Sequence, residues 1–299
     1  MTNHRATAQV DSLASTYRRL AVDQDGALNQ IALAEVPEAV QQSNAIENST
    51  LTLQDTERIL AGQLPSGRHD LREVLEAANL ARVTSDLLST AEPLTIDLIL
   101  RWHGNLLAGI RDDVAGRFRR AGEWVRVGSH LAANPEFVPS LIEDALAHYE
   151  ANDSDHVLDR IARFHCEFEI VHPFADGNGR IGRVLINKQL KDLGLPPVIV
   201  RSRNRQADYY PLFARYAVAD DHAGMTRLLA LLLQEALHKR IALLTSRRIV
   251  SLSEWARTTG IAGNAAANQA RRQTIPAFRL RNRWMIAEEY RPAGSPHRA

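Results

Sequence analysis

The chain has 299 residues, of which 45% are hydrophobic and 24% are charged, and its formal net charge is +1. This balance is typical of a globular protein rather than a disordered one, and no apolar run approaches the roughly 20 residues of a membrane-spanning helix. The single cysteine is Cys166, and the first residues lack the basic-then-apolar order of a signal peptide. We therefore expect a globular protein of the reducing cytoplasm with no membrane partner.

Apolar residues recur at helical spacing through most of the chain, which predicts a mostly helical fold. Residues 122–139 break this pattern, because the alternation WVRV and the glycine, serine and prolines after it predict a short hairpin or an ordered loop. Thr52, followed three residues later by Asp55 and then by a closing Gly62, predicts a capped short helix over residues 52–62. The other helices are predicted over residues 27–48, 69–88, 95–110, 139–152, 156–171 and 180–194.

The segment 172–183, HPFADGNGRIGR, carries the strongest functional signal in the chain. Pro173 marks the end of one helix, and a glycine-rich turn leads into the next. The unpaired N–H groups and the positive dipole end of that second helix suit an anion, and phosphate is the natural candidate. Gly177 and Gly179 would let the backbone come close to phosphate oxygens without a Cβ in the way.

Charged side chains in the same segment extend this interpretation. Arg180 and Arg183 share one helical face as two guanidinium forks, Asp176 can hold Mg2+ against phosphate oxygens, and His172 can accept a hydroxyl proton near neutral pH. Each of these residues alone has an ordinary structural explanation. A metal hydrolase with His165, His172 and Asp176 as ligands lacks a complete ligand set and gives the arginines no role.

These residues also carry a family resemblance. Residues 172–180, HPFADGNGR, followed by Ile181, Gly182 and Arg183, resemble the signature of Fic-domain proteins at every defining position. The resemblance covers roughly residues 95–240 and implies an all-α core that holds a nucleotide, with a small β-hairpin flap. It implies a protein adenylyltransferase, which transfers AMP from ATP to a Ser, Thr or Tyr hydroxyl of a target protein and releases pyrophosphate.

The family pattern assigns a role to each residue of the segment. His172 would deprotonate the target hydroxyl, Asp176 would bind Mg2+ between the α- and β-phosphates, and Asn178 would steady the α-phosphate. The backbone amides around Gly177 and Gly179 would cradle the β-phosphate. The guanidinium groups of Arg180 and Arg183 would bind the phosphate tail.

Two further features bear on the donor nucleotide. Doc-like kinases carry lysine where Gly179 stands, so the glycine favours nucleotide transfer over phosphorylation; relatives that transfer UMP or phosphocholine leave the donor open. Tyr209 and Tyr210 of DYYPLF stand where the family often lines its base pocket, although core aromatics would look the same. Phe174 is apolar among polar neighbours, so we expect it to anchor the loop in the core.

Residues 43–48, SNAIEN, resemble the inhibitory motif of the family through Ser43, Glu47 and Asn48. The resemblance implies that Glu47 pairs with Arg183, the arginine meant for the γ-phosphate. ATP could still enter, but its α-phosphorus would not line up with the incoming hydroxyl, so the resting protein should be weakly active. In some relatives the same glutamate positions a water that removes AMP, and auto-modification is a further option.

The flap, about residues 124–131, is where the resemblance places the target protein, whose segment would pair with the hairpin by β-augmentation. Backbone pairing reads little sequence, so side chains such as Trp124, Arg126 and His130 do not identify the target. The resemblance is also compatible with a homodimer.

The last segment of the chain, residues 247–299, is strongly basic. Ten arginines stand against three glutamates, which gives this segment a net charge of +7. Such a charge favours nucleic acid or an acidic protein as partner, and a solvated arginine face explains it equally well. We take residues 1–94 as an N-terminal helical region with the inhibitory motif, 95–240 as the Fic core and 247–299 as a separate basic domain.

The pattern of this basic domain, helix, turn at Gly260, helix and two short strands, loosely resembles a winged helix-turn-helix. The second helix would present Asn264, Asn268, Arg271 and Arg272 to DNA, and a wing would present Arg279, Arg281 and Arg283 to phosphates. The alternative function is therefore a DNA-binding transcriptional regulator that uses the Fic core as a nucleotide sensor. Winged helices on Fic cores can also bind proteins or form dimers.

Overall fold

The computed structural model describes residues 3–127, 130–151 and 155–292. Contacts between Cα atoms divide the chain into two compact units, residues 32–229 and residues 1–31 together with 230–299. The functional boundaries that the sequence suggests, at residues 94, 240 and 247, stay a prediction.

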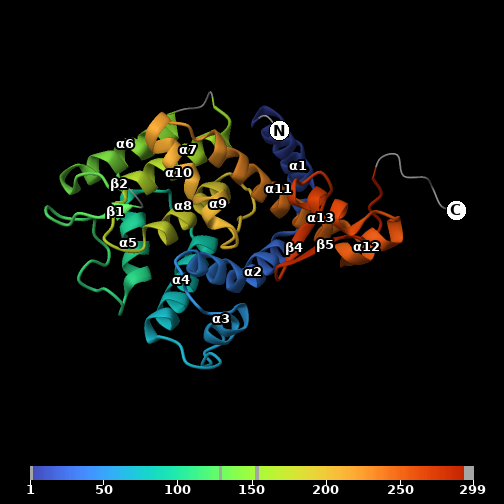
Figure 1. Ribbon diagram of the computed structural model, residues 1–299, viewed down its shortest axis with the longest axis horizontal. Helices are drawn as coiled ribbons and strands as arrows, with labels where there is room; N and C mark the ends of the chain where they lie inside the picture. Colours follow the sequence, from blue (N-terminus) through green and yellow to red (C-terminus); the bar gives the residue numbers. More distant parts are fainter. Residues whose placement is uncertain (1–2, 128–129, 152–154, 293–299) are drawn as a thin grey trace. The chain divides into compact units, whose positions relative to one another are not determined.

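The larger unit, residues 32–229, is a bundle of helices and confirms the all-α prediction (Figure 1). The observed helices before residue 195 lie within a few residues of the predicted ranges, as expected because helix ends fray, whereas those after residue 200 had no predicted range. They are α2 (Asp25–Ile46, which enters this unit at Ala32), α3 (Leu53–Leu60), α4 (Leu71–Ser89), α5 (Ile96–Leu107), α6 (Val138–Ala151), α7 (Val157–Val171), α8 (Asn178–Asp192), α9 (Arg205–Asp208), α10 (Tyr210–Ala219) and the first turns of α11 (Ala223–Thr245).

Two N-terminal caps set the direction of the helices near the functional segment. The Thr52 side chain accepts from the Asp55 backbone N–H, and Asp55 accepts from Thr52 in return, so the predicted capping box of α3 is confirmed. Asp70 caps α4 by accepting from the backbone N–H of Arg72. This cap fixes Arg72 in the first turn of α4.

The core of this unit lies between α4, α5, α7 and α8, and the loop between α7 and α8 is tied into it by Phe174. The Phe174 side chain is fully buried and its ring stacks on His103 of α5 at 3.7 Å between centroids. The prediction that Phe174 anchors the loop is confirmed. Burial of an aromatic ring contributes about 2 kcal/mol, so this contact holds the loop against the core.

A small hairpin follows α5. Strand β1 (Arg126–Val127) pairs antiparallel with β2 (His130–Leu131), with Arg126 opposite Leu131 and Val127 opposite His130. This confirms the predicted hairpin, while Gly128 and Ser129 at its turn lie outside the described residues. A 3-10 turn (η1, Pro135–Phe137) then leads into α6.

The smaller unit combines α1 (Asn3–Ala21) with the chain from Ala230 onward. Its three strands, β3 (Ile249–Ser251), β4 (Phe278–Leu280) and β5 (Arg283–Ala287), form an antiparallel sheet in the order β3-β5-β4. Helices α12 (Leu252–Thr259) and α13 (Gly263–Arg271) flank the predicted turn at Gly260, which is left-handed with φ 74°. The predicted helices and the last two strands are confirmed; β3 and α1 are additions, and the winged-helix assignment stays a prediction.

Hydropathy of the helices bears on the membrane prediction. Among the residues that the structure describes, no helix combines the length and the apolar character needed to cross a bilayer.

Candidate active site

The loop between α7 and α8 is held by one buried arginine. Arg119 is 3% exposed, and its backbone N–H donates to the carbonyl oxygen of Pro173 at 2.9 Å. Its guanidinium group donates to four further backbone carbonyl oxygens, those of Val171, His172, Glu123 and Ala133. Three of these contacts, to Val171, His172 and Pro173, tie the start of the loop to Arg119 and leave it little freedom to move.

His103 supports the other end of the loop. The backbone N–H of Gly116 donates to His103 Nδ1 at 3.0 Å, so the ring proton lies on Nε2, which donates to the Asp176 carbonyl oxygen at 3.0 Å. Burial lowers the pKa of His103 to about 4, so the ring is neutral at physiological pH. His103 therefore fixes the backbone of Asp176 without adding charge to the site.

His172 closes α7 in the left-handed region, with φ 51° and ψ 63°. Its Nδ1 lies 3.2 Å from the carbonyl oxygen of Glu169. A neutral imidazole that donates from Nδ1 has Nε2 as its accepting nitrogen, which is the form that a general base needs. The His172 side chain is 20% exposed, enough for a substrate hydroxyl to reach it.

Asp176 belongs to a closed ring of alternating charges. Its Oδ1 accepts from Arg180 Nη2 at 3.0 Å, and its Oδ2 accepts from Arg72 Nη2 at 2.6 Å. Glu76 Oε1 completes the ring, 3.0 Å from both Arg72 Nε and Arg180 Nη1. Burial raises the pKa of Asp176, but Arg180 and Arg72 outweigh burial and hold that pKa below its usual value.

The donor set at Asp176 fits Mg2+, which takes one or two carboxylates and fills its other positions with water and substrate phosphate oxygens. Within the described residues, no group of three or more His, Cys, Asp or Glu side chains could hold a metal ion by itself. The hydrolase alternative also needed His165, which is buried and bonds to the Tyr209 hydroxyl at 2.7 Å. A metal here would therefore depend on oxygens from the substrate.

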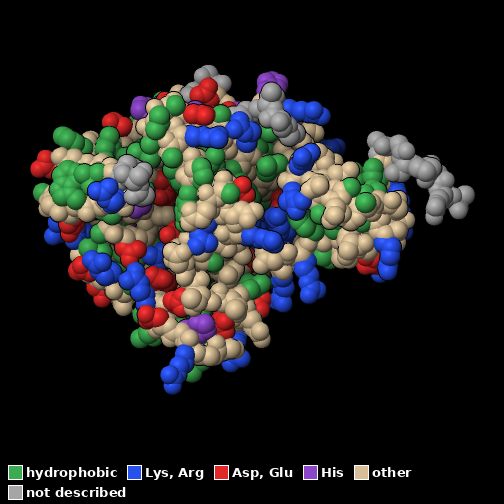
Figure 2. Space-filling model, viewed as in Figure 1, with side chains coloured by type: hydrophobic (Ala, Val, Ile, Leu, Met, Phe, Trp, Pro, Cys, Tyr) green, Lys and Arg blue, Asp and Glu red, His purple; other side chains and the backbone are tan. Residues whose placement is uncertain are grey.

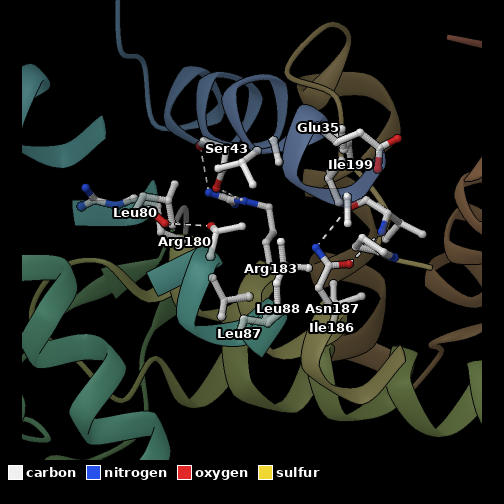
Figure 3. A pocket seen from close by; sticks show the side chains of 18 residues that line it. Glu35, Ser43, Leu80, Leu87, Leu88, Arg180, Arg183, Ile186, Asn187 and Ile199 are labelled. Carbon is white, nitrogen blue, oxygen red and sulfur yellow. Dashed lines mark hydrogen bonds between the residues drawn. The ribbon is translucent and has the colours of Figure 1, made fainter. Parts of the chain in front are cut away.

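Arg183 is bound to Ser43 and Glu47 at the end of α2, the segment that the sequence predicts to be inhibitory. Its Nε donates to Ser43 Oγ at 2.9 Å, and its Nη2 donates to the Ser43 carbonyl oxygen at 3.0 Å and to Glu47 Oε1 at 2.8 Å. Figure 3 shows Arg183 extending from α8 to Ser43. The Arg183 side chain is 7% exposed, whereas the Glu47 side chain is 39% exposed. The ion pair therefore joins a buried cation to an anion that keeps much of its contact with water.

Two backbone features let Glu47 reach this position. Asn48 ends α2 with φ 71°, a left-handed conformation that asparagine tolerates better than most residues. Gly179 has no side chain where one would collide, because a Cβ there would lie 2.4 Å from Glu47 Oε1. Asn or Gly after the glutamate and Gly179 at the start of α8 are thus both required by the observed contact.

Asn178 and the two tyrosines make structural contacts. Asn178 accepts from the Phe174 N–H and donates to the Phe174 carbonyl oxygen, both at 2.8 Å. Tyr209 is 3% exposed, and half-buried Tyr210 donates to the Ile46 carbonyl oxygen at 3.0 Å. Their roles in binding the α-phosphate and the base stay predictions.

Most of the predicted residues meet at one cavity of about 440 Å³. The predicted residues that line it are Glu47, Asn48, His172, Asp176, Gly177, Asn178, Gly179 and Arg180. Ser43 and Arg183 line a neighbouring cavity of about 60 Å³ under α2, together with Arg180. Neither Tyr209 nor Tyr210 lines these two cavities of the described chain.

Residues 93–190 of this chain match the model of the Fic/DOC family. The chain therefore contains a Fic domain. The matched range contains α5, the hairpin, α6, α7 and most of α8, and hence the whole loop with His172 and Asp176.

Named relatives of this Fic-domain protein are adenylyltransferases. The chain is 33% identical over 177 residues to "Protein adenylyltransferase Fic" of Nematostella vectensis and 32% identical over 201 residues to "Protein adenylyltransferase fic-1" of Caenorhabditis elegans. These alignments cover 57% and 61% of this chain, but 41% and 39% of the relatives. The chain thus spans about two-fifths of the length of the curated relatives it matches.

Solved structures show the same fold. A fragment of Fic-1 from C. elegans superposes with a TM-score of 0.68 at 27% identity, covering 80% of this chain and 71% of that one. A Fic family protein from Desulfovibrio desulfuricans covers 99% of this chain and 97% of its own at a TM-score of 0.68 and 23% identity, which supports the fold alone.

Sequence reasoning missed four residues that shape this Fic site: His103, Arg119, Arg72 and Glu76. All four reach the loop from elements between 53 and 104 positions away, and Arg72 and Asp176 are 104 residues apart. No local pattern marks such residues. Arginine as a residue type was the only signal for Arg72 and Arg119, and the chain contains many other arginines.

Proposed function

We propose that this protein is an autoinhibited protein adenylyltransferase, which transfers AMP from ATP to a Ser, Thr or Tyr hydroxyl of a target protein and releases pyrophosphate. The observation that carries the proposal is the cavity that gathers His172, Asp176 and the glycine turn beside Glu47. The names of the relatives point to the same reaction. The proposal concerns the whole reaction, since this chain spans only part of those relatives.

The chemistry follows from the orientation of three groups. His172, with its Nδ1 toward the Glu169 carbonyl, takes the proton of the target hydroxyl on Nε2, and the hydroxyl oxygen attacks the α-phosphorus as pyrophosphate leaves. The backbone N–H groups at the start of α8 bind the phosphate oxygens. Asp176 would hold Mg2+, which supplies positive charge to the phosphates when bound.

Autoinhibition follows from competition for one guanidinium group. Glu47 binds Arg183 in the position that a γ-phosphate would need. ATP then binds with its phosphate tail displaced, and a shift of about 1 Å at the reacting atom lowers the rate by roughly 100-fold. Removal of AMP by the same glutamate and auto-modification remain within this proposal as alternative outcomes.

The target would dock at the β1–β2 hairpin by adding a strand to it. Leu131 and Trp124 are both 53% exposed, so apolar surface is available next to that strand. Backbone pairing of this kind places a hydroxyl without reading much sequence.

The decisive experiment compares the wild type, Glu47→Gly and Glu47→Gly/His172→Ala. Each protein is incubated with Mg2+ and α-labelled ATP, GTP, UTP or CTP, with and without cell extract as a source of target, and intact masses are measured. An AMP unit that appears with Glu47→Gly and is lost with His172→Ala supports donor, base and inhibition together. Absence of transfer from every nucleotide in all three proteins contradicts the proposal.

A second candidate is DNA binding by the smaller unit, and one observation favours it. Helix α13 buries only alanines, Ala266 and Ala270, and leaves the side chains of Asn264, Asn268, Arg271 and Arg272 exposed. Arginine side chains of this segment are visible in Figure 2. Arg279 is different, because it pairs with Glu235 at 2.9 Å and stacks on Trp284.

This candidate is tested with the full chain and random duplex DNA at several salt concentrations. Binding that weakens steeply with salt, and less steeply after Arg271→Ala/Arg272→Ala, would support a DNA-binding regulator. Binding that ignores salt, or none at 50 mM salt, would leave a protein partner for this segment.

A further inference from the structure

Glu169 is a buried carboxyl group that the proposed mechanism does not use. It lies on α7 three residues before His172, is 7% exposed, and its Oε1 has no hydrogen-bond partner among the described residues. Its other oxygen, Oε2, lies 3.9 Å from His172 Nδ1. A buried carboxyl group lowers the stability of the fold unless hydrogen bonds or an ion pair compensate for the lost water. The position of Glu169 therefore needs an explanation.

The Glu169 carboxyl group lies where a side chain at Gly182 of the motif would stand. A Cβ on Gly182 of α8 would lie 2.4 Å from Glu169 Oε1 and 3.0 Å from a ring carbon of His165. Any side chain at position 182 would therefore push Glu169 away from the histidine. Gly182 matched the family signature without a role of its own in phosphate binding, and this contact supplies one.

Among the described residues, Glu169 forms no ion pair with an arginine or a lysine, and the nearby Arg183 has other partners. Arg183 of α8 is engaged by Ser43 and Glu47, while His165 is held by Tyr209 and has its pKa lowered to about 3 by burial. Burial raises the pKa of Glu169 to about 8, Arg183 lowers it and Glu47 raises it. The groups that face Glu169 are His165 and Cys166 of α7, His172, Arg183 of α8, Glu47 of α2 and Tyr209.

We propose that Glu169 is a positioning residue for the base: its carboxyl group lies on the Nδ1 side of the His172 imidazole and stabilises the positive charge that the ring acquires during transfer. The proposal rests on the proposed function for its catalytic consequence. When the target O–H bond breaks, the proton goes to His172 Nε2, the oxygen bonds to the α-phosphorus, and pyrophosphate leaves with its electron pair. The imidazolium formed then faces Glu169 and the Glu169 carbonyl oxygen.

The two groups are close enough to titrate as a pair. A positive ring 3.9 Å away favours the ionised carboxyl group, and an ionised carboxyl group favours the positive ring. The ring of His172 should therefore report two titration steps, one of its own and one near pH 8 that belongs to Glu169. A residue that only fills space would produce no second step.

The test uses the full chain with Glu47→Gly as the parent and adds Glu169→Gln, which keeps the size of the side chain and removes its titration. The 15N shifts of the His172 ring are followed from pH 5 to pH 9.5, with His172→Ala to assign them. We expect the step near pH 8 to vanish with Glu169→Gln. Where the parent transfers AMP, kcat should fall about ten-fold while KM for ATP changes less than about two-fold.

The matched control is Glu167→Gln, on the same helix, where Glu167 pairs with Arg163 and Tyr216. It should keep the His172 titration of the parent. An unchanged titration in Glu169→Gln, or an equal change in Glu167→Gln, overturns the proposal. Failure of the parent to transfer AMP contradicts the proposed function instead, and the ring titration still decides the role of Glu169.

Discussion

Arg180 and Arg183 lie one turn apart on α8 and are both buried, yet different parts of the chain neutralise them. Arg180 belongs to the ring with Asp176, Glu76 and Arg72, whose carboxylate side chains are 24% and 12% exposed. The carboxylate paired with Arg183 is that of Glu47, whose side chain is 39% exposed. The difference indicates that the first arginine holds the loop together, while the second is bound by a carboxylate that keeps much of its hydration in the pair.

The largest effect expected from this comparison is on stability. Arg180→Ala removes the buried cation of the ring and leaves Glu76 and Asp176 with the half-exposed Arg72, so we expect the free energy of unfolding to fall by about 3 kcal/mol. Denaturant unfolding measures it. Arg101→Ala, which breaks a surface pair with Glu92, is the control and should cost under about 1 kcal/mol. An equal decrease in the free energy of unfolding in both variants would contradict a structural role for Arg180.

Arg183 is tested by a graded change at its partner. Glu47→Gln keeps a hydrogen bond to Arg183 Nη2 but loses the charge, which weakens the contact by about 1 kcal/mol. We expect AMP transfer about five-fold above wild type and below that of Glu47→Gly. Initial rates of label incorporation give the order. Transfer by Glu47→Gln equal to wild type would show that the charge of Glu47 is not what inhibits.

The pH dependence of stability tests the buried carboxyl group beside Arg183. The pKa of Glu169 is raised from 4.5 to about 8, so the folded protein binds this proton more tightly than the unfolded chain does. Its contribution to the free energy of unfolding is complete below pH 4.5 and is lost as pH rises toward 8. Glu169→Gln should remove this loss. Calorimetric Tm values at several pH values measure it, and parallel curves for the two proteins would contradict it.

The smallest effect is expected at the exposed corner of the ring. The Arg72 side chain is 48% exposed and donates to Asp176 Oδ2, an oxygen that a metal would need. Because such pairs are worth about 0.2–1 kcal/mol, Arg72→Ala should tighten Mn2+ binding in the presence of ATP by about 1.5- to 5-fold. Electron paramagnetic resonance of free Mn2+ measures this directly. Unchanged or weaker Mn2+ binding would exclude competition between Arg72 and the metal.

Much of the site could be predicted because it is local. His172, Asp176, Gly177 and Gly179 stand in one loop between two helices, and the glycines and the helix start follow from spacing alone. Glu47 and Arg183 are 136 positions apart, and their pairing was implied by the family resemblance alone. The structure has Arg183 Nη2 at 2.8 Å from Glu47 Oε1. Tyr209 could not be placed by sequence, because a base-pocket aromatic and a core aromatic have the same pattern.

The sequence by itself determined the helical order, the caps, the loop that joins α7 to α8 and the residues able to bind phosphate. These depend on periodicity, φ preferences and side-chain type within a few positions of one another. The tertiary structure decided which carboxylate neutralises which arginine, that Arg72 and Glu76 close the ring around Asp176, and that Glu169 lies buried under His172. Such pairings depend on the packing of helices far apart in sequence, and no local pattern encodes the distance between two helix faces.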